Sequence, residues 1–139
     1  MRQHQEVLEV RTRGRGFEDV TERVNEVLAR AGIVRGVCVV FCRHTSCGLL
    51  VQENADPSVR RDLLAWWARI APDGDPRYEH DDEGPDDMAA HLRTTLVRTS
   101  ETLPFDGGRL ALGRWQALYL VEHRLAPHRR ELVVHLTGE

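Results

Sequence analysis

The sequence predicts an α+β fold built on a mostly antiparallel, β-sandwich-like sheet with about three helices. Segments with strand character outnumber segments with helical spacing, and the two kinds do not alternate as they do in βαβ units. The last third of the chain has strand character throughout. The chain has 139 residues, of which 41% are hydrophobic. That is enough for one core, so we expect a single domain over residues 1–139.

The first strand and the first helix follow from two different periodicities. Residues 6–13 alternate loosely between apolar and polar side chains, which predicts a strand that is interrupted at residues 14–16. Thr21 is expected to cap a helix over residues 22–31, because apolar side chains recur there on one face and Gly32 follows the last turn.

Two strands and a second helix come next. Residues 37–42 form a valine-rich apolar run that predicts a buried strand, and residues 47–52 resume the strand pattern after a polar interruption. Asp56 as N-cap, followed by Pro57 at the first helical position, is a strong helix start. Apolar spacing continues this helix as far as Ile70.

The third helix is expected after an acidic loop. Gly84-Pro85 has the chemistry of a turn, and Asp86 then suits an N-cap for a helix that runs to about Val97. The apolar face of this helix is expected to consist of Met88, Leu92 and Leu96.

The C-terminal third predicts four strands. Asp106-Gly107-Gly108 has the composition of a hairpin turn. The expected strands cover residues 99–103, 109–112, 116–124 and 129–137. Apolar side chains occupy both faces of the third of these strands, which indicates a second layer or a subunit interface.

Composition and charge exclude several classes of protein. A net charge of −3 gives no basic footprint for nucleic acid or for anionic membranes. No apolar run approaches the length of about 18 residues that a membrane-spanning helix requires. The N-terminal residues 1–6 lack the apolar core of a signal peptide. We therefore expect a cytoplasmic protein without nucleic-acid or membrane partners.

The three cysteines, Cys38, Cys42 and Cys47, are an odd number, which argues against a disulfide framework. Cys38 and Cys42 lie in the apolar run and point to one face of a strand, so we expect them to act as small buried hydrophobes. Cys47 stands beside a polar motif, where either packing or a reactive thiol is consistent with the sequence.

Residues 78–91 are the densest group of metal-binding side chains, with two histidines and six carboxylates among fourteen residues. His80 and His91 are expected to meet across the turn, and His44, at a strand end, is expected to join them. Three histidines with an open fourth position are typical of catalytic zinc. The surrounding carboxylates, Asp87 among them, would orient the imidazoles or would instead hold Mg²⁺ beside a phosphorylated substrate. The alternative interpretation is a solvated acidic loop with a half-buried histidine.

A second polar cluster lies at the end of the long apolar strand. Glu122 and Arg124 share one face of that strand. The arginine fork suits a phosphate, so Arg124 is expected to hold the substrate while Glu122 fixes Arg124 or relays a proton. Arg129 and Arg130 offer the same chemistry nearby. A solvated strand end with a surface ion pair is the alternative.

Several motifs, taken in order, resemble the signature of the YjbQ-like proteins. They are His44-Thr-Ser46, Gln52-Glu-Asn-Ala-Asp-Pro57, Tyr78-Glu-His-Asp81, Glu83-Gly-x-Asp-Asp-Met88, His91, Leu112-Gly-x-Trp-Gln116, Tyr119-Leu-x-Glu-His-Arg124 and Thr137-Gly-Glu139. The resemblance runs from about Gly16 to the C-terminus. Departures occur at Cys47, where the family mostly has alanine, at Gln52, where asparagine is common, and at Arg114, which replaces a small residue.

The resemblance implies a compact αβ fold, a homotrimer and weak thiamine-phosphate synthase activity, in which a thiazole phosphate joins a pyrimidine pyrophosphate. The expected catalytic residues are His44, Glu122 and Arg124. The residues expected to bind the phosphorylated small-molecule substrate are Thr45, Ser46, Asn54, Trp115, Gln116 and Arg130. The expected metal ligands are His44, His80 and His91, with zinc as the metal and Mg²⁺ as the alternative. A metal- or small-molecule-binding protein with incidental synthase activity is the competing hypothesis.

Overall fold

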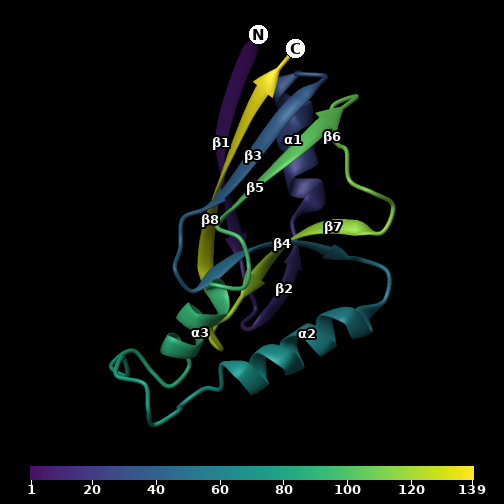
Figure 1. The fold of residues 1–139 in the computed structure, drawn as a ribbon. Coiled ribbons are helices and arrows are strands. Elements are labelled where there is room, and N and C mark those ends of the chain that lie inside the picture. Colours follow the sequence, from purple (N-terminus) through teal and green to yellow (C-terminus); the bar gives the residue numbers. More distant parts are fainter.

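The computed structural model describes residues 1–139 and contains two antiparallel sheets and three helices, which confirms the predicted fold class (Figure 1). The strands are β1 (Arg2–Arg11), β2 (Gly16–Asp19), β3 (Gly36–Cys42), β4 (Cys47–Glu53), β5 (Ser100–Asp106), β6 (Arg109–Leu110), β7 (Gln116–Glu122) and β8 (Arg129–Gly138). The helices are α1 (Thr21–Ala31), α2 (Pro57–Ile70) and α3 (Asp87–Thr94). No helix is both long enough and apolar enough to cross a membrane.

The larger sheet has the strand order β1-β8-β3-β5-β6, and the smaller sheet has the order β2-β7-β4. Figure 1 shows α1 behind the long strands of the larger sheet, while α2 runs beneath the smaller sheet. The main core lies between the larger sheet, α1 and the inner face of the smaller sheet. Leu28 of α1, Leu132 of β8 and Leu120 of β7 all belong to this core and are fully buried.

Strand β7 is buried on both faces because the chain itself supplies a second layer. Leu118 and Leu120 face the main core. Tyr119 and Val121 face the other way and pack with Trp67 of α2 in a separate apolar cluster. The apolar character of both faces of β7 is therefore satisfied within one chain, and α2 is the second layer that the sequence indicated.

The two glycines at the paired ends of β3 and β8 permit a close backbone approach. Gly36 is opposite Gly138 in the antiparallel register. A Cβ atom on Gly36 would lie 2.0 Å from the Thr137 carbonyl oxygen, and one on Gly138 would lie 2.0 Å from that of Arg35. Only residues without a side chain fit both positions.

Strand β2 and the start of α1 differ from the sequence prediction. Residues 16–19 form a strand that pairs with β7, although local composition indicated only an interruption. Val20, not Thr21, is the N-cap of α1, and its side chain makes no capping hydrogen bond. The carboxylate of Asp19 accepts the backbone N–H of Thr21 at 3.0 Å. The Thr21 hydroxyl instead accepts the backbone N–H of Leu118 at 2.9 Å. A tertiary hydrogen bond has therefore taken the oxygen that would otherwise cap the helix.

Helix α3 also differs from the prediction, in both length and buried face. It ends at Thr94, and its buried side chains on the helix interior are Ala89, Ala90 and Arg93 rather than Met88, Leu92 and Leu96. The small alanines let the helix approach the body closely, while the guanidinium of Arg93 donates to the Ala71 carbonyl at 3.1 and 3.3 Å. Asp86 is at the N-cap position, but its side chain makes no capping hydrogen bond.

Candidate functional site

His80, Asp87 and His91 form one group whose ligand atoms all lie within 4.8 Å of one another. His80 Nε2 lies 2.7 Å from Asp87 Oδ2, and His91 Nε2 lies 3.2 Å from the same oxygen. Asp87 begins α3 and His91 follows one helical turn later, so both project from the same face. His80 reaches them from the loop before the helix. We call these three residues the His–Asp–His group.

Arg124, just beyond the end of β7, holds the loop and helix of this group in place. Its Nε donates to Asp86 Oδ2 at 3.0 Å, its Nη1 donates to Asp87 Oδ1 at 2.9 Å, and its Nη2 donates to the Glu83 carbonyl oxygen at 2.8 Å. The backbone N–H of Leu125 also donates to Asp86 Oδ2, at 2.8 Å. The planar fork thus joins the acidic loop to the smaller sheet.

The tautomer of His91 follows from its backbone contact. His91 Nδ1 lies 2.8 Å from the carbonyl oxygen of Thr45, which can only accept a hydrogen bond. Nδ1 therefore carries a proton and donates, and the lone pair of a neutral ring is left on Nε2. A histidine that ligates a metal commonly donates its other nitrogen to a backbone carbonyl in this way.

The hydrogen bonds and charges within the group shift the pKa values of His80 and Asp87. The hydrogen bond with Asp87 raises the pKa of His80. Burial tends to raise the pKa of Asp87, whose side chain is only 4% exposed, but His80, the charge of His91 and Arg124 outweigh it and lower that pKa. The group therefore keeps an ionised carboxylate between two imidazoles.

A polar hollow of about 390 Å³ adjoins His91. It is lined by His44, Thr45, Cys47, His91, Thr94, Thr95, Arg98 and Thr99. Backbone hydrogen bonds of 2.6 and 2.8 Å between Leu49 and Arg98 fix the segment that carries the arginine. The hydroxyls of Thr94 and Thr95 donate to the carbonyls of His91 and Leu92 at 2.7 and 2.6 Å. The hydroxyls of Thr45 and Thr99 are therefore the ones that, beside a guanidinium, suit an anionic oxygen ligand. We call this cavity the threonine hollow.

His44 lines the threonine hollow but is not part of the His–Asp–His group. Its Nε2 accepts the backbone N–H of Glu131 at 2.7 Å, so that nitrogen is occupied. Burial and the charge of Arg130 lower its pKa, which favours the neutral ring. Asp87 is the residue that converges with His80 and His91. The sequence placed Asp87 only among the carboxylates that would orient the imidazoles, although its spacing of four residues from His91 on a helix was a usable signal.

Glu122 and Arg130 form a buried ion pair at the junction of the two sheets. Arg130 Nε donates to Glu122 Oε1 at 2.9 Å, and Arg130 Nη2 donates to Ser46 Oγ at 2.9 Å. Thr12 Oγ1 donates to Glu122 Oε1 at 2.7 Å. Burial tends to raise the pKa of Glu122, but Arg130 and Thr12 outweigh it, so that pKa is lowered.

This arrangement changes the partnership that the sequence assigned to Glu122. The carboxylate contacts Arg124 only through the backbone N–H of that residue, at 3.2 Å. Asp86 and Asp87, rather than Glu122, hold the Arg124 guanidinium. Ser46 and Arg130, both predicted to bind substrate, are buried in the ion-pair junction.

The remaining predicted substrate residues lie at the opposite end of the smaller sheet. Asn54 follows β4, and its Nδ2 donates to the carbonyl oxygen of Gln116 at 3.4 Å. Trp115 is 56% exposed, and the guanidinium of Arg114 lies 4.8 Å from its ring centre. β4 has seven residues, so its two ends are about 20 Å apart at the usual rise per residue. Within one chain these residues and the His–Asp–His group form two separate clusters.

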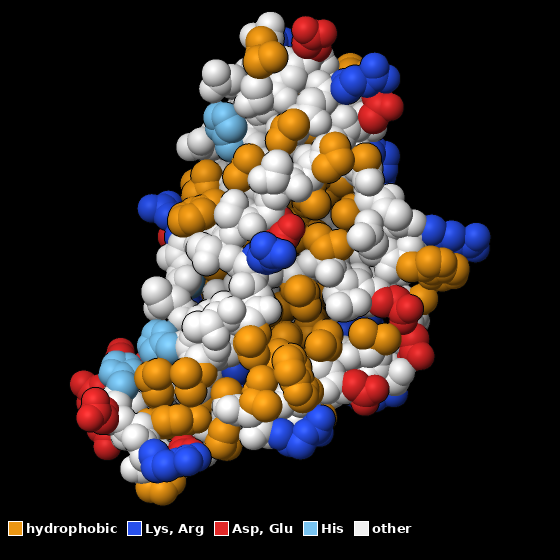
Figure 2. All heavy atoms as spheres, in the orientation of Figure 1, with side chains coloured by type: hydrophobic (Ala, Val, Ile, Leu, Met, Phe, Trp, Pro, Cys, Tyr) orange, Lys and Arg blue, Asp and Glu red, His pale blue; other side chains and the backbone are white.

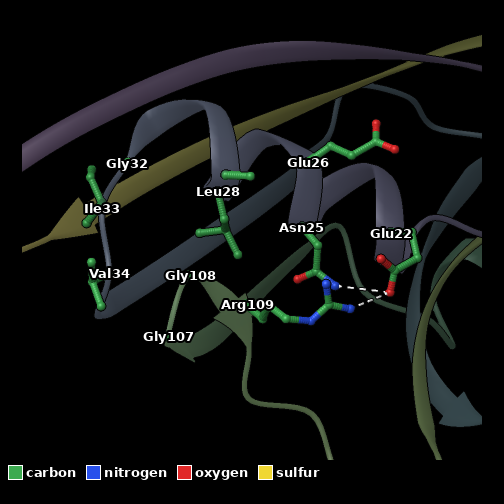
Figure 3. A pocket seen from close by; sticks show the side chains of 11 residues that line it. Glu22, Asn25, Glu26, Leu28, Gly32, Ile33, Val34, Gly107, Gly108 and Arg109 are labelled. Carbon is green, nitrogen blue, oxygen red and sulfur yellow. Dashed lines mark hydrogen bonds and ion pairs between the residues drawn. The ribbon is translucent and has the colours of Figure 1, made fainter.

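The largest hollow, about 470 Å³, lies between α1 and the β5–β6 hairpin (Figure 3). Three of its polar side chains, Glu22, Asn25 and Arg109, already have hydrogen-bond partners within the protein. Arg109 Nη2 donates to Glu22 Oε1 at 2.8 Å, and Asn25 Nδ2 donates to the same oxygen at 3.3 Å. Asn25 Oδ1 accepts the backbone N–H of Leu110 at 2.8 Å. The chemistry therefore favours the smaller threonine hollow as the functional site.

Comparison with known proteins gives one consistent result. A sequence model of the family described as "UPF0047 protein YjbQ-like" matches residues 6–139. A UPF0047 protein of Synechocystis sp. is 47% identical over 99% of this chain and 94% of its own length. The UPF0047 protein YjbQ of Escherichia coli O157:H7 is 38% identical over 98% of this chain and 99% of its own length.

The fold agrees with solved structures of similar proteins. A conserved hypothetical protein of Thermus thermophilus superposes with a TM-score of 0.86 at 40% identity, covering 95% of this chain and 99% of that one. A YjbQ/UPF0047 protein of Clostridium acetobutylicum superposes with a TM-score of 0.83 at 30% identity, covering 96% and 99%. Sequence and structure thus lead to the same assignment: this chain belongs to the YjbQ-like UPF0047 family.

Proposed function

We propose that this protein is a divalent-metal-dependent enzyme that acts on a phosphorylated small molecule at the His–Asp–His group and the threonine hollow. One observation carries the proposal. His91 uses Nδ1–H for the Thr45 carbonyl, yet its Nε2 faces the carboxylate oxygen of Asp87 at 3.2 Å. Two lone pairs do not approach each other in this way without a positive charge between or upon them. A divalent cation, or a proton in its absence, meets that requirement.

The donor set fits zinc. Two imidazole nitrogens and one carboxylate oxygen are a set of three protein ligands that leaves a position open for substrate. When bound, zinc would supply Lewis-acid polarisation of a phosphoryl oxygen. A second, overlapping group of His80, Asp82 and Glu83 is richer in oxygen and is more exposed. That group favours Mg²⁺ as the alternative metal.

Cationic side chains near the group support a phosphorylated substrate. The guanidinium of Arg124 has five N–H donors, of which three hydrogen bonds to Asp86, Asp87 and Glu83 use three. Two donors remain for a ligand. Arg98 adds a second guanidinium at the threonine hollow. The Thr45 hydroxyl can complete the coordination of a phosphate there, whereas the Thr94 hydroxyl already donates to the His91 carbonyl at 2.7 Å.

The reaction that we propose is the formation of thiamine phosphate, as the family resemblance implies. The ring nitrogen of a thiazole phosphate forms a bond to the methylene carbon of a pyrimidine pyrophosphate, and the carbon–oxygen bond to pyrophosphate breaks. The departing pyrophosphate takes the electron pair of that bond. Arg124 and Arg98 would bind its negative charge, which increases as it leaves.

A metal- or small-molecule-binding protein is the second candidate. The observation in its favour is that Asp86 and Asp87 already neutralise Arg124, so its remaining donors bind an anion less strongly than a free guanidinium would. Saturable zinc binding without turnover of the two substrates would select this second function.

We further propose a homotrimer with its sites at the subunit boundaries. The predicted substrate residues Asn54 and Gln116 lie at the opposite end of the smaller sheet from the His–Asp–His group. A head-to-tail ring would bring the two ends together from neighbouring subunits.

The outward face of the larger sheet is also apolar enough to bind a neighbour: Val7, Val37 and Phe41 are 44–49% exposed. Figure 2 shows scattered apolar side chains in the upper half of the molecule, where the larger sheet lies, and a denser group of them in the lower half. Light scattering that reports a monomer at micromolar concentration would exclude the trimer.

The decisive experiment measures zinc binding by calorimetry on metal-free protein, followed by thiamine phosphate formation. His80→Ala and His91→Ala should each lower zinc affinity at least about tenfold, the smallest loss typical of changing even an outer-shell partner of a metal. His44→Ala tests whether this third histidine also contributes to zinc affinity. Arg124→Lys retains the charge but lacks the fork, so it should impair substrate binding. Because the fork also orients Asp87, zinc should bind this variant more weakly than the wild type, but still measurably. Unchanged zinc affinity in both His80→Ala and His91→Ala would refute the proposal.

A further inference from the structure

We infer that Cys42 and Cys47 form a reversible redox site, a dithiol that hydrogen peroxide converts to a disulfide. Their Sγ atoms lie 3.4 Å apart. Cys42 is the last residue of β3 in the larger sheet, and Cys47 is the first residue of β4 in the smaller sheet. The inference rests on this sulfur contact, on the position of Cys47 at a hollow, and on the contrast with Cys38.

The two side chains are already oriented toward each other. A disulfide bond is about 2.05 Å long, so the sulfur atoms need to approach by only about 1.4 Å. The Cys42 thiol also lies 3.6 Å from the carbonyl oxygen of Cys47, so its side chain points at the start of β4. Side-chain rotation at the two strand ends, with a small shift of the four-residue turn between them, brings the sulfurs together.

A small oxidant can reach the pair of thiols from the threonine hollow, beside Cys47. Cys47 is one of the residues that line the threonine hollow, even though only 2% of its surface is exposed. Hydrogen peroxide is small enough to reach such a position. Cys38 is fully buried, lines none of the described hollows and has no sulfur contact, so it provides an internal comparison.

Conversion of the two thiols to a disulfide needs hydrogen peroxide as its only oxidant. The hydrogen bond between the two sulfurs lowers the pKa of Cys42 and raises that of Cys47, so Cys42 is the nucleophile. Its sulfur attacks one peroxide oxygen, the O–O bond breaks, and a sulfenic acid and one water form. The Cys47 sulfur then attacks the Cys42 sulfur, the S–O bond breaks, and a second water leaves with the Cys47 thiol proton. Two thiols lose two electrons in total, and both peroxide oxygens end in water. A thiol reductant reverses the change by exchange.

The cross-link would constrain a turn that contacts the proposed site. Thr45 and Ser46 lie between the two cysteines. The Thr45 carbonyl accepts from His91 Nδ1, and Ser46 Oγ accepts from Arg130. An effect of oxidation on zinc affinity rests on the proposed function, whereas disulfide formation itself does not. The two can therefore fail separately.

The test uses the full-length protein under native conditions. The reduced protein is treated with a small excess of hydrogen peroxide, and intact mass and free thiols are then measured after quenching and unfolding. We expect the loss of two hydrogen atoms and two thiols, restored by dithiothreitol. Trypsin cleaves after Arg43 and so separates the two cysteines, which makes the disulfide visible as a linked pair of peptides.

Matched variants identify the partners. Cys38→Ala should form the disulfide as the wild type does, because Cys38 shares a tryptic peptide with Cys42 but does not contact Cys47. Cys42→Ala and Cys47→Ala should form none. If the wild type instead gains oxygen without linking, or links only after unfolding, the inference is wrong. Linking that persists in Cys42→Ala would also overturn it, and the wild-type peptide map remains decisive where a variant fails to fold.

Discussion

Arg124 and Asp87 form an ion pair through one oxygen of the Asp87 carboxylate, which leaves the other oxygen to contact the two histidines. Arg124 Nη1 donates to Oδ1 at 2.9 Å, while Oδ2 faces His80 and His91. One carboxylate thus connects Arg124, through Oδ1, to the two imidazoles, through Oδ2. A charged partner on one oxygen fixes the direction in which the other oxygen points.

Asp87→Asn should lower zinc affinity at least about tenfold, because it removes both a charge and a well-oriented ligand oxygen. Calorimetric titration of metal-free protein measures the change. Asp86→Asn is the matched control, since Asp86 also binds Arg124 but does not contact either histidine. An equal loss in both variants would show that Arg124, rather than the ligand oxygen, controls zinc binding.

His123 predicts a particular pH dependence of stability. Its ring is fully buried against Trp67, neither nitrogen has a hydrogen-bond partner, and burial lowers its pKa from 6.5 to about 3. The unfolded state therefore binds a proton below pH 6.5 that the folded state does not bind until about pH 3. Stability should fall as pH decreases through this window, by about 1.4 kcal/mol per pH unit.

His123→Leu should remove that contribution and leave the protein at least as stable near pH 7, because it deletes two unsatisfied polar atoms. Urea unfolding at several pH values measures the difference between variant and wild type. His135→Gln, a half-buried position on β8, is the control and should retain the wild-type slope. A parallel pH profile in His123→Leu would contradict the assignment.

Glu122→Gln should destabilise the fold by about 3–5 kcal/mol, because it leaves the Arg130 charge buried without its counter-ion. Denaturant unfolding at pH 7 measures this loss. Glu131→Gln removes one member of an exposed pair with Arg43 at 3.8 Å and should change stability by less than about 1 kcal/mol. The lowered pKa of Glu122 also predicts how this contribution depends on pH. The stabilisation by the ionised carboxylate is present above pH 4.5 and is lost as pH falls through the folded-state pKa.

Gly36→Ala should cost about 3 kcal/mol, the upper end for an added methyl group, since the methyl would meet the Thr137 carbonyl at 2.0 Å and force β3 and β8 apart. Thermal unfolding measures the effect. Gly113→Ala is the comparison, because its Cβ would meet only the movable Gln116 side chain, at 3.2 Å. Its cost should stay within about 1 kcal/mol. Similar losses for both would mean that the close strand approach is not the cause.

Sequence reasoning succeeded where a local signal defines the structure. Asp56 caps α2 by accepting the N–H of Ser58 at 2.9 Å, as the Asp-Pro pair predicted. Gly107 and Gly108 both have positive φ in the β5–β6 turn, as a tight hairpin requires. Strand β2 had no such signal, because it depends on pairing with β7, about a hundred residues later.

The candidate site was partly predictable for the same reason. His80 and His91 are near each other in sequence, and the Gly-Pro turn between them indicated that they meet. His44 comes from a turn whose direction depends on the packing of both sheets. The contact of its ring with the Glu131 backbone links residues 87 apart in sequence, which no local pattern encodes.

The position of β8 within the larger sheet has a consequence for synthesis on the ribosome. β8 is the last strand along the chain, yet it lies between β1 and β3 and pairs with both over most of its length. Until β8 emerges, β1 has no partner and one edge of β3 is open. Such unpaired edges are prone to aggregation. We therefore expect the nascent chain to depend on chaperones until β8 has been synthesised, and to commit to its fold only afterwards.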